Sequence, residues 1–157
     1  MEKAYKYKLK GVGPPKYHLG GDFYEDPDGT LVWGAKSYID RLLTNFKLMF
    51  GEDPKIASSP LVQGDSLELD ESLELDQNGI KQYQSLIGAL QWCITLGRFD
   101  ISCAVMTMSR FRCNPKQGHL ERIKRICGYL KKRNDGAIRF RTGIPNNEAF
   151  YAPEVHN

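Results

Sequence analysis

Apolar residues recur at intervals of three and four between residues 83 and 130, which is the spacing of one face of an α-helix. The pattern predicts three consecutive helices, each with one buried side and one solvated side. Their apolar faces are Tyr83, Leu86, Ile87, Leu90 and Ile94 in the first, Ile101, Val105 and Met108 in the second, and Leu120, Ile123, Cys127 and Leu130 in the third.

Turn-forming residues mark the ends of these helices. Gly97 stands where a left-handed residue would end the first helix, and Asp100 stands where an N-cap would open the second, over residues 101–112. Asn114-Pro115 stops the second helix, so the third begins near Gln117. Gly88 lies on the apolar side of the first helix, where the missing side chain would let another backbone come close.

A β-hairpin is predicted near the start of the chain. Residues 17–24 form its first strand, residues 26–29 (Asp-Pro-Asp-Gly) a tight turn, and residues 30–33 the returning strand. Gly20-Gly21 within the first strand indicates either a bulge in an edge strand or a close approach of another backbone.

Residues 35–48 follow the hairpin and show helical spacing, with Tyr38, Leu42 and either Phe46 or Leu48 on one face. Gly51 and Pro54 end this helix. Near the other end of the chain, residues 137–141 alternate apolar and basic side chains as a short strand would. Residues 143–157 show no periodicity and resemble a frayed end. Together these elements predict an α+β fold.

Composition narrows the class of protein. A chain of 157 residues suffices for one hydrophobic core or for an incomplete piece of a larger protein. No apolar run is long enough to span a membrane, and no apolar segment follows the lysine-rich start as it would in a signal peptide. We therefore expect an intracellular protein without a membrane partner.

Charge is unevenly distributed along the chain, although the net charge is only +3. Residues 98–141 carry twelve Lys or Arg against three acids, and residues 1–20 carry five lysines against one glutamate. Between these two segments, all the charged residues of 65–76 are acidic. A near-repeat of six residues begins at Ser66 and again at Ser72. Alternating leucines there would suit a strand, but crowded like charges favour a solvated, flexible loop.

No complete catalytic set is present. Two-metal phosphoryl transfer needs carboxylates held around the ions, and the sequence has no Asp-Asp pair. The four cysteines form no Cys-x-x-Cys motif, so neither a zinc site nor a redox site is indicated. His18, His119 and His156 lack a recognisable Ser or Cys partner, and His119 suits a helix start better than a catalytic base. No cofactor is expected in this chain.

A long series of residue types in fixed order runs through the three predicted helices. It comprises Tyr83, Leu86, Ile87, Gly88, Leu90 and Trp92, then Arg98, Asp100, Ile101, Ala104 and Val105, then Ser109, Arg110, Phe111, Pro115 and His119, then Lys124, Arg125, Ile126, Tyr129, Leu130 and Lys131. This order resembles the reverse transcriptase of copia-type LTR retrotransposons, in the part that follows the polymerase active site and precedes RNase H. The resemblance covers roughly residues 5–141. It departs from the family at residues 97–100, which usually read Thr-Arg-Pro-Asp, and at residues 128–132, which usually read Arg-Tyr-Leu-Lys-Gly and here read Gly-Tyr-Leu-Lys-Lys.

The resemblance implies a set of nucleic-acid contacts. Tyr17, His18, Leu19 and Gly20 match the Leu-Gly hairpin called the primer grip, which holds the 3′ end of the growing strand. A residue without a side chain lets backbone and phosphate meet closely. The family's thumb and connection grip the template-primer duplex, and the corresponding basic residues here are Arg98, Lys124, Arg125, Lys131 and Lys132. The alternative for these residues is an ordinary solvated helix face.

The resemblance also implies an organisation. Residues 1–61 would be the end of the palm with the primer-grip hairpin and the first helix, 62–80 an acidic linker, 81–133 a helical thumb and connection segment, and 134–157 a short strand and tail. The Tyr-x-Asp-Asp aspartates that bind Mg²⁺ in the full-length family would precede Met1, and the RNase H carboxylates would follow residue 157. The partners would be an RNA–DNA or DNA duplex and the missing palm and RNase H parts, in a cytoplasmic particle or the nucleus.

Three functional hypotheses follow. In the first, the chain is a fragment of an RNA-directed DNA polymerase that grips the duplex and does not perform phosphoryl transfer. No enzymatic activity is then expected of this chain alone. Alternatively, it is a free-standing, non-catalytic basic module that binds nucleic acid. In the third hypothesis it is a decayed reading frame without a stable fold.

Overall fold

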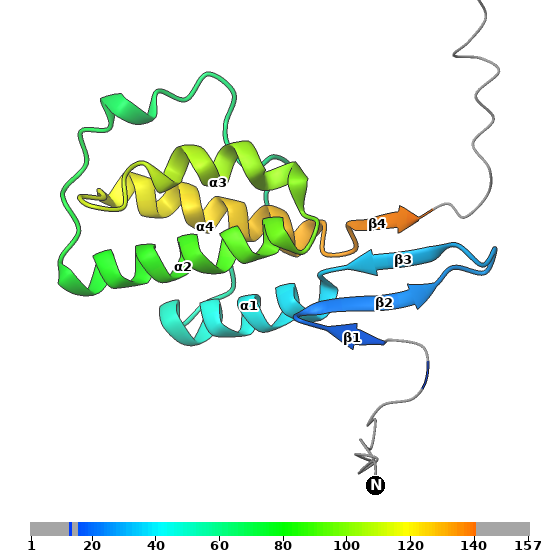
Figure 1. Cartoon of the computed structure of the whole chain (residues 1–157). Helices are drawn as coiled ribbons and strands as arrows, with labels where there is room; N and C mark the ends of the chain where they lie inside the picture. The colour runs from blue at the N-terminus through cyan, green and yellow to red at the C-terminus, as the bar shows by residue number, and fades with distance from the viewer. Residues whose placement is uncertain (1–12, 14–15, 141–157) are drawn as a thin grey trace, which may run out of the picture.

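The structure, a computed structural model, describes Gly13 and residues 16–140. It confirms the α+β class, with antiparallel strands at one end of the molecule and helices at the other (Figure 1). The predicted tail at 143–157 and most of the segment before Tyr17 lie outside the described residues. The elements are β1 (Tyr17–His18), β2 (Gly21–Glu25), β3 (Leu31–Gly34), α1 (Lys36–Phe50), η1 (Leu67–Leu69), α2 (Gln77–Thr95), η2 (Phe99–Ile101), α3 (Ser102–Ser109), α4 (Gln117–Lys132) and β4 (Ala137–Phe140).

The sheet has four antiparallel strands in the order β1-β2-β3-β4. The predicted hairpin is present as β2 and β3, and its turn closes with Gly29 N–H donating to the Asp26 carbonyl at 2.9 Å. The predicted short strand near the end of the chain is β4, which pairs with β3 so that Trp33 lies opposite Ile138. This pairing joins the two ends of the described chain, and local sequence pattern could not indicate it.

The single strand predicted over residues 17–24 is wrong, because the chain turns back at Leu19-Gly20. His18 pairs with Gly21, which leaves a two-residue turn with φ of 49° at Leu19 and 97° at Gly20. Positive φ at both central positions matches the right-handed twist of the flanking strands. Gly20-Gly21 is therefore neither a bulge nor part of a continuous strand.

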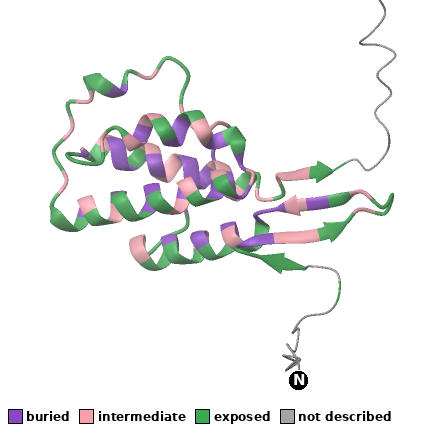
Figure 2. Ribbon diagram, in the orientation of Figure 1, coloured by how far each residue is buried: buried purple, intermediate pink, exposed green. Residues whose placement is uncertain are grey.

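One hydrophobic core lies between the helices, and Figure 2 shows their buried faces turned toward one another. The predicted apolar stripe of α4 is buried, and Ile126 joins it. On α1, Phe46 and not Leu48 completes the buried face, because Leu48 is 80% exposed. Tyr83 of α2 is fully buried, and its hydroxyl donates to the Met108 carbonyl of α3 at 2.6 Å.

The beginning and end of α1 have different causes. Gly51 ends the helix as predicted, in the left-handed conformation with φ of 77°. At the start, the backbone N–H of Ser37 donates to the Asp22 carboxylate of β2 at 2.8 Å. A carboxylate at this position satisfies a free N–H and complements the helix dipole. The sheet therefore caps the helix that follows it.

The start of the second predicted helix differs from the expectation. Gly97 ends α2 as predicted, with φ of 99°. Asp100, however, is not an N-cap. It lies within η2, its carboxylate is bonded to Arg98, and α3 is shorter than the predicted 101–112 helix. An ionic partner two residues away has taken the carboxylate that would otherwise cap the helix.

Two of the helical glycines, Gly88 and Gly128, have opposite environments, and the prediction for Gly88 is wrong. Gly88 is exposed on α2, and a Cβ added there would meet no atom within 4 Å. The close backbone approach occurs instead at Gly128 of α4, where an added Cβ would overlap the Lys55 carbonyl. The segment after α1 therefore crosses α4 at a position where no side chain fits.

Substituting each glycine by alanine should change stability in opposite directions. Gly88→Ala should raise the free energy of unfolding by about 0.5–1 kcal/mol, because alanine costs less backbone entropy in an exposed helix. Gly128→Ala should lower it by about 1–3 kcal/mol, because the Lys55 backbone must move. Urea unfolding of both variants checks this, and equal effects of the same sign would contradict the packing described.

Candidate nucleic-acid interface

One side of the Leu19-Gly20 turn packs against the protein, and the other side is open to solvent. A Cβ on Gly20 would lie 3.1 Å from Trp92 Nε1 and 3.3 Å from Leu96 Cδ1, so the turn rests on the end of α2. The Leu19 side chain is 68% exposed, and His18 is also exposed. The close approach that favoured glycine is therefore made within the chain, while the tip of the turn faces solvent.

Arg41 of α1 supports the turn from the side, and sequence reasoning did not include it. Its guanidinium lies 5.7 Å from the centre of the Tyr17 ring and donates a hydrogen bond to the Tyr17 hydroxyl. It also lies 5.9 Å from the Tyr38 ring. Trp92 carried part of the family resemblance but was not predicted as a site residue. The signal that could have indicated its role is a large aromatic residue on the polar side of a helix, where its side chain is 40% exposed.

The predicted basic residues of α4 face parts of the chain itself. Lys124 Nζ lies 2.8 Å from the Glu121 carboxylate and 4.5 Å from the centre of the Phe50 ring. Lys131 Nζ lies 3.4 Å from the Asp53 carboxylate. Both lysines therefore cover the end of α1 and the segment that follows it.

Arg125 and Lys132 differ in their exposure. Arg125 donates to the Ser59 hydroxyl at 3.2 Å, and its Nε is buried without a hydrogen-bond partner. Lys132 is exposed at the end of α4. Of the four predicted basic residues on this helix, Lys132 is the one most open to solvent.

The acidic segment lies against α4 instead of extending into solvent. Leu67 in η1 is buried in the core, and the Gly118 N–H at the start of α4 donates to Ser72 at 2.8 Å. An isolated antiparallel β-bridge pairs the backbones of Glu74 and Lys116. The segment is a loop, as predicted, but its packing contradicts the expectation of a flexible linker.

Arg122 holds the acidic loop on α4. Its guanidinium donates two hydrogen bonds to Asp65, at 2.7 and 2.8 Å, and another to Asp70. Burial alone would raise the pKa of Asp70. Hydrogen bonds from Ser72 and then Arg122 outweigh this and lower the pKa to about 2. A cation on the polar side of α4 is thus neutralised by acids more than fifty residues away in the sequence.

Arg98 is buried and does not lie on a basic surface. It is 2% exposed, and its Nε and Nη2 donate to the two Asp100 oxygens at 2.9 and 2.8 Å. Burial would raise the pKa of Asp100, but the hydrogen bonds and charge of Arg98 outweigh it and the pKa lies below its ordinary value. Arg98 Nη1 is buried without a partner.

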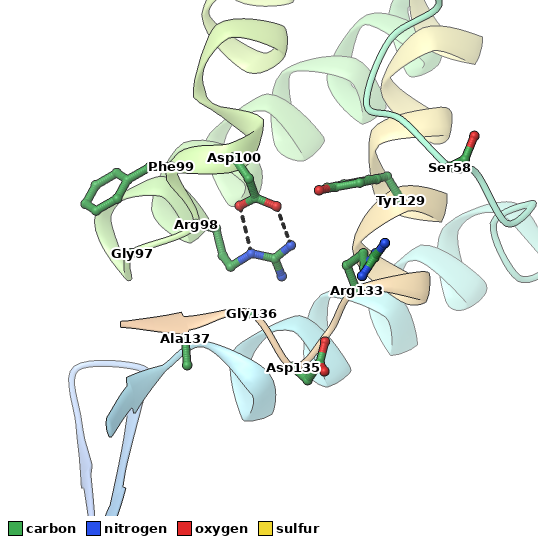
Figure 3. A pocket seen from close by; sticks show the side chains of 10 residues that line it. All are labelled: Ser58, Gly97, Arg98, Phe99, Asp100, Tyr129, Arg133, Asp135, Gly136 and Ala137. Atoms are coloured by element: carbon green, nitrogen blue, oxygen red, sulfur yellow. Dashed lines mark hydrogen bonds and ion pairs between the residues drawn. The ribbon is translucent and has the colours of Figure 1, made fainter. Parts of the chain in front are cut away.

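A pocket of about 420 Å³ opens beside Arg98 (Figure 3). Tyr129 and Arg133 face Arg98 and Asp100 across it. The other residues that line the pocket are Ser58, Gly97, Phe99, Asp135, Gly136 and Ala137. The structure thus places the predicted residues in three locations: the hairpin tip, the surface of α4 and this pocket.

Metal chemistry has no ligand set within the described part of the chain. There, no three His, Cys, Asp or Glu side chains cluster as metal ligands would. The described residues therefore do not fit the Mg²⁺ ions of a polymerase site. All four cysteines are free thiols, and burial raises the pKa of Cys93 to about 12. His119 Nδ1 instead accepts from the Lys116 N–H at the start of α4, as expected of a helix-start residue.

Curated relatives of the chain come from transposons. A protein of Saccharomyces cerevisiae named for transposon Ty5-1 is 30% identical over 155 residues, which cover 96% of this chain and 47% of the yeast protein. The retrovirus-related Pol polyprotein from transposon TNT 1-94 of Nicotiana tabacum is 29% identical over 141 residues, covering 85% of this chain and 10% of the polyprotein. The chain belongs to the Pol proteins of copia-type retrotransposons.

A third relative, and the share of each relative that is covered, show the extent of the match. An uncharacterized mitochondrial protein of Arabidopsis thaliana is 30% identical over 126 residues, covering 80% of this chain and 49% of that protein. The chain thus spans about half the length of the yeast and mitochondrial relatives and a tenth of the tobacco polyprotein. No family profile and no solved structure matches it. Within the described residues, no helix is long and apolar enough to cross a membrane.

Removing the Arg122 guanidinium should release the acidic loop. Arg122→Met should lower the free energy of unfolding by about 1–3 kcal/mol, because Asp70 and Asp65 lose a charged partner. The folded pKa of Asp70 is depressed, so its contribution to stability is present above the unfolded value near 4 and is lost as pH falls toward 2.

Urea unfolding between pH 7 and pH 2.5 measures this contribution. Stability of the native sequence should fall across the acid range more steeply than that of the Asp70→Asn variant. Lys36→Met is a matched control, because the Lys36 ion pair with Asp40 is largely exposed. Identical acid profiles for the native and Asp70→Asn chains would contradict the role of this carboxylate.

Proposed function

We propose that this Pol-family chain is part of the reverse transcriptase region and contributes to gripping the template-primer duplex, without performing phosphoryl transfer. The relatives' names and the ordered motifs of residues 83–131 support the region. The observation that carries the gripping role is the Leu19-Gly20 turn. It is supported by Trp92 and Arg41, and its tip is exposed.

A rigid, exposed turn suits contact with a strand end. Fixing Gly20 against α2 and Tyr17 against α1 limits the loss of conformational freedom when a ligand binds. The Tyr17 and His18 side chains supply a hydroxyl and an imidazole of the kinds that bind phosphate and sugar oxygens. In this proposal the hairpin tip is the primary contact.

The basic residues of α4 have a secondary part in the proposal. Lys132 is available to a phosphate without any rearrangement. Lys124 and Lys131 would first exchange their carboxylate partners for phosphate, which is feasible because partly exposed ion pairs contribute little stability. The expected dependence of binding on salt is therefore modest, since few phosphates are neutralised.

The same proposal assigns the remaining organisation. Residues 1–61 are the end of the palm and the first helix, and residues 81–133 are the thumb and connection. The partners are an RNA–DNA or DNA duplex and the parts of the polymerase that would carry the catalytic aspartates and RNase H. Residues 62–76 form a docked loop before α2 begins at Gln77, so we propose that the segments on either side of this loop act as one unit.

A negative charge at the hairpin tip should weaken duplex binding. Leu19→Asp should lower affinity for a fluorescent RNA–DNA hybrid by about fivefold or more, because a carboxylate there repels the phosphates. The fold should be retained, since Asp adopts the left-handed conformation of position 19 more readily than Leu. Fluorescence anisotropy across a salt series is the measurement.

Leu48→Asp serves as the matched control, because Leu48 is also highly exposed but lies on the outer face of α1. It changes the net charge equally and should leave affinity close to that of the native chain. Equal weakening by both variants would show that only total charge matters. Full affinity in Leu19→Asp would exclude the hairpin tip as the contact.

A further inference from the structure

Leu19 has a backbone conformation that is unfavourable for leucine. Its φ of 49° is positive, and it is the one non-glycine residue with positive φ in the part of the chain that the structure describes. In this region the Cβ of an L-residue comes close to the following carbonyl group, so glycine, asparagine and aspartate are the usual occupants. The tip of the hairpin is therefore strained by the residue that it carries.

The turn itself does not require a leucine. Its two central residues both have positive φ, which is the geometry that Asn-Gly and Asp-Gly sequences form most readily. An asparagine at position 19 would close the same turn with less strain. The conformation of the hairpin therefore does not explain the side chain of Leu19.

Packing within the chain does not compensate for this strain either. The Leu19 side chain is largely exposed, whereas Gly20 beside it is buried against Trp92 and Leu96. Other exposed leucines, such as Leu48, have ordinary backbone conformations. Strain that is kept at an exposed position indicates a functional contact.

The chemistry of the tip changes from polar to apolar over three residues. Tyr17 and His18 are exposed and can form hydrogen bonds with phosphate and sugar oxygens. Leu19 offers no hydrogen bond from its side chain, so that side chain gains from contact with apolar surface. A ligand that fits this tip has polar oxygens and a small apolar surface side by side.

A deoxyribose strand has this combination. Base faces inside a duplex are stacked on one another, but the sugars line the wide, shallow minor groove of an A-form helix, where a narrow turn can reach them. Deoxyribose presents a C2′ methylene group there, and ribose presents a hydroxyl. Leucine against that hydroxyl would remove it from water without a hydrogen-bond partner, which is unfavourable.

We propose that Leu19 contacts the sugar of the gripped strand and makes the hairpin tip selective for deoxyribose over ribose. This inference rests on the proposed function, because it takes the duplex held by the hairpin as the ligand. Leu19 is then a specificity-determining residue. Tyr17 and His18 supply contacts that both kinds of strand can make.

Fluorescence anisotropy with two labelled RNA–DNA hybrids tests the selectivity of the full chain. The hybrids have the same base sequence, and the last few nucleotides at the 3′ end of the DNA strand are deoxyribonucleotides in one and ribonucleotides in the other. The native chain should bind the deoxyribonucleotide end more tightly, by about fivefold or more, because a hydroxyl is otherwise left without a partner. Equal affinity for the two ends would overturn the proposal.

A third hybrid separates the hydroxyl from the shape of the sugar. Nucleotides with a 2′-fluorine at the same end adopt the ribose conformation but carry no hydroxyl group. The native chain should bind this end nearly as well as the deoxyribonucleotide end. Binding as weak as that of the ribonucleotide end would show that helix shape is recognised, and would overturn the contact between Leu19 and the sugar.

Leu19→Asn should raise stability and remove selectivity. Asparagine tolerates the left-handed conformation, so the urea midpoint of unfolding should rise. Its amide can form a hydrogen bond with a 2′-hydroxyl, so the preference for the deoxyribonucleotide end should disappear. A lower midpoint would show that Leu19 serves packing, and an unchanged preference would show that another group recognises the sugar. Either result would overturn the proposal.

Two further variants are controls. Leu19→Met keeps an apolar side chain at the tip and should keep the preference. Leu48→Asn removes another highly exposed leucine, on α1, and should bind both ends as the native chain does. Loss of the preference in either variant would overturn the assignment, because the preference would then not follow from an apolar side chain at position 19.

The grip and the sugar selectivity can fail separately. If Leu19→Asp weakens binding while the native chain binds both ends equally, the hairpin tip is the contact and the sugar proposal fails. If the native chain binds neither hybrid, the grip fails and the sugar proposal fails with it. A preference that is present in the native chain and absent in Leu19→Asn supports both.

Discussion

The burial of α4 is the constraint on which the rest of the structure depends. Its apolar stripe packs against α2 and α3, and Gly128 lets the segment after α1 cross the helix with its Lys55 carbonyl in close contact. Long cationic side chains of α4 near this crossing lie against other segments of the same chain. Lys124 covers Phe50, and Arg122 is surrounded by the acidic loop. Apart from the exposed Lys132, the basic residues discussed on α4 are therefore engaged within the chain before they are available to a ligand.

Because the basic residues of α4 are largely engaged, the candidate contacts lie at the C-terminal end of α2. The end of α2 supports the Leu19-Gly20 turn through Trp92 and Leu96, and the chain that follows it contributes Arg98 and Phe99 to the pocket. One end of one helix thus positions the proposed hairpin contact and one wall of the pocket.

Features that depend on local pattern were predictable from the sequence. The stripe of α4 and the left-handed Gly51 follow from spacing and from the conformational freedom of glycine. Pairs that join distant residues were not predictable, such as Arg122 with Asp65 and Asp22 with the start of α1. Nothing in the sequence near either partner specifies the other, because their proximity is a result of the fold.

Three glycine positions show which close contacts the sequence could indicate. Gly20 was expected where a backbone or a phosphate comes close, and its neighbours in the structure are the Trp92 and Leu96 side chains. Gly88 and Gly128 look alike in the sequence, since each interrupts an amphipathic helix, and only the path of residues 51–57 distinguishes them. The family resemblance implied a set of nucleic-acid contacts, and side-chain packing determines which of those residues reach the surface here.

Photochemical cross-linking tests the central claim most directly. An RNA–DNA hybrid with 5-iodouracil at the 3′ end of the primer strand is irradiated with the purified chain, and the attached residues are identified by mass spectrometry. The account predicts cross-links at Tyr17 or His18, beside the exposed Leu19 tip. Cross-links confined to α4, with none at the hairpin, would contradict it.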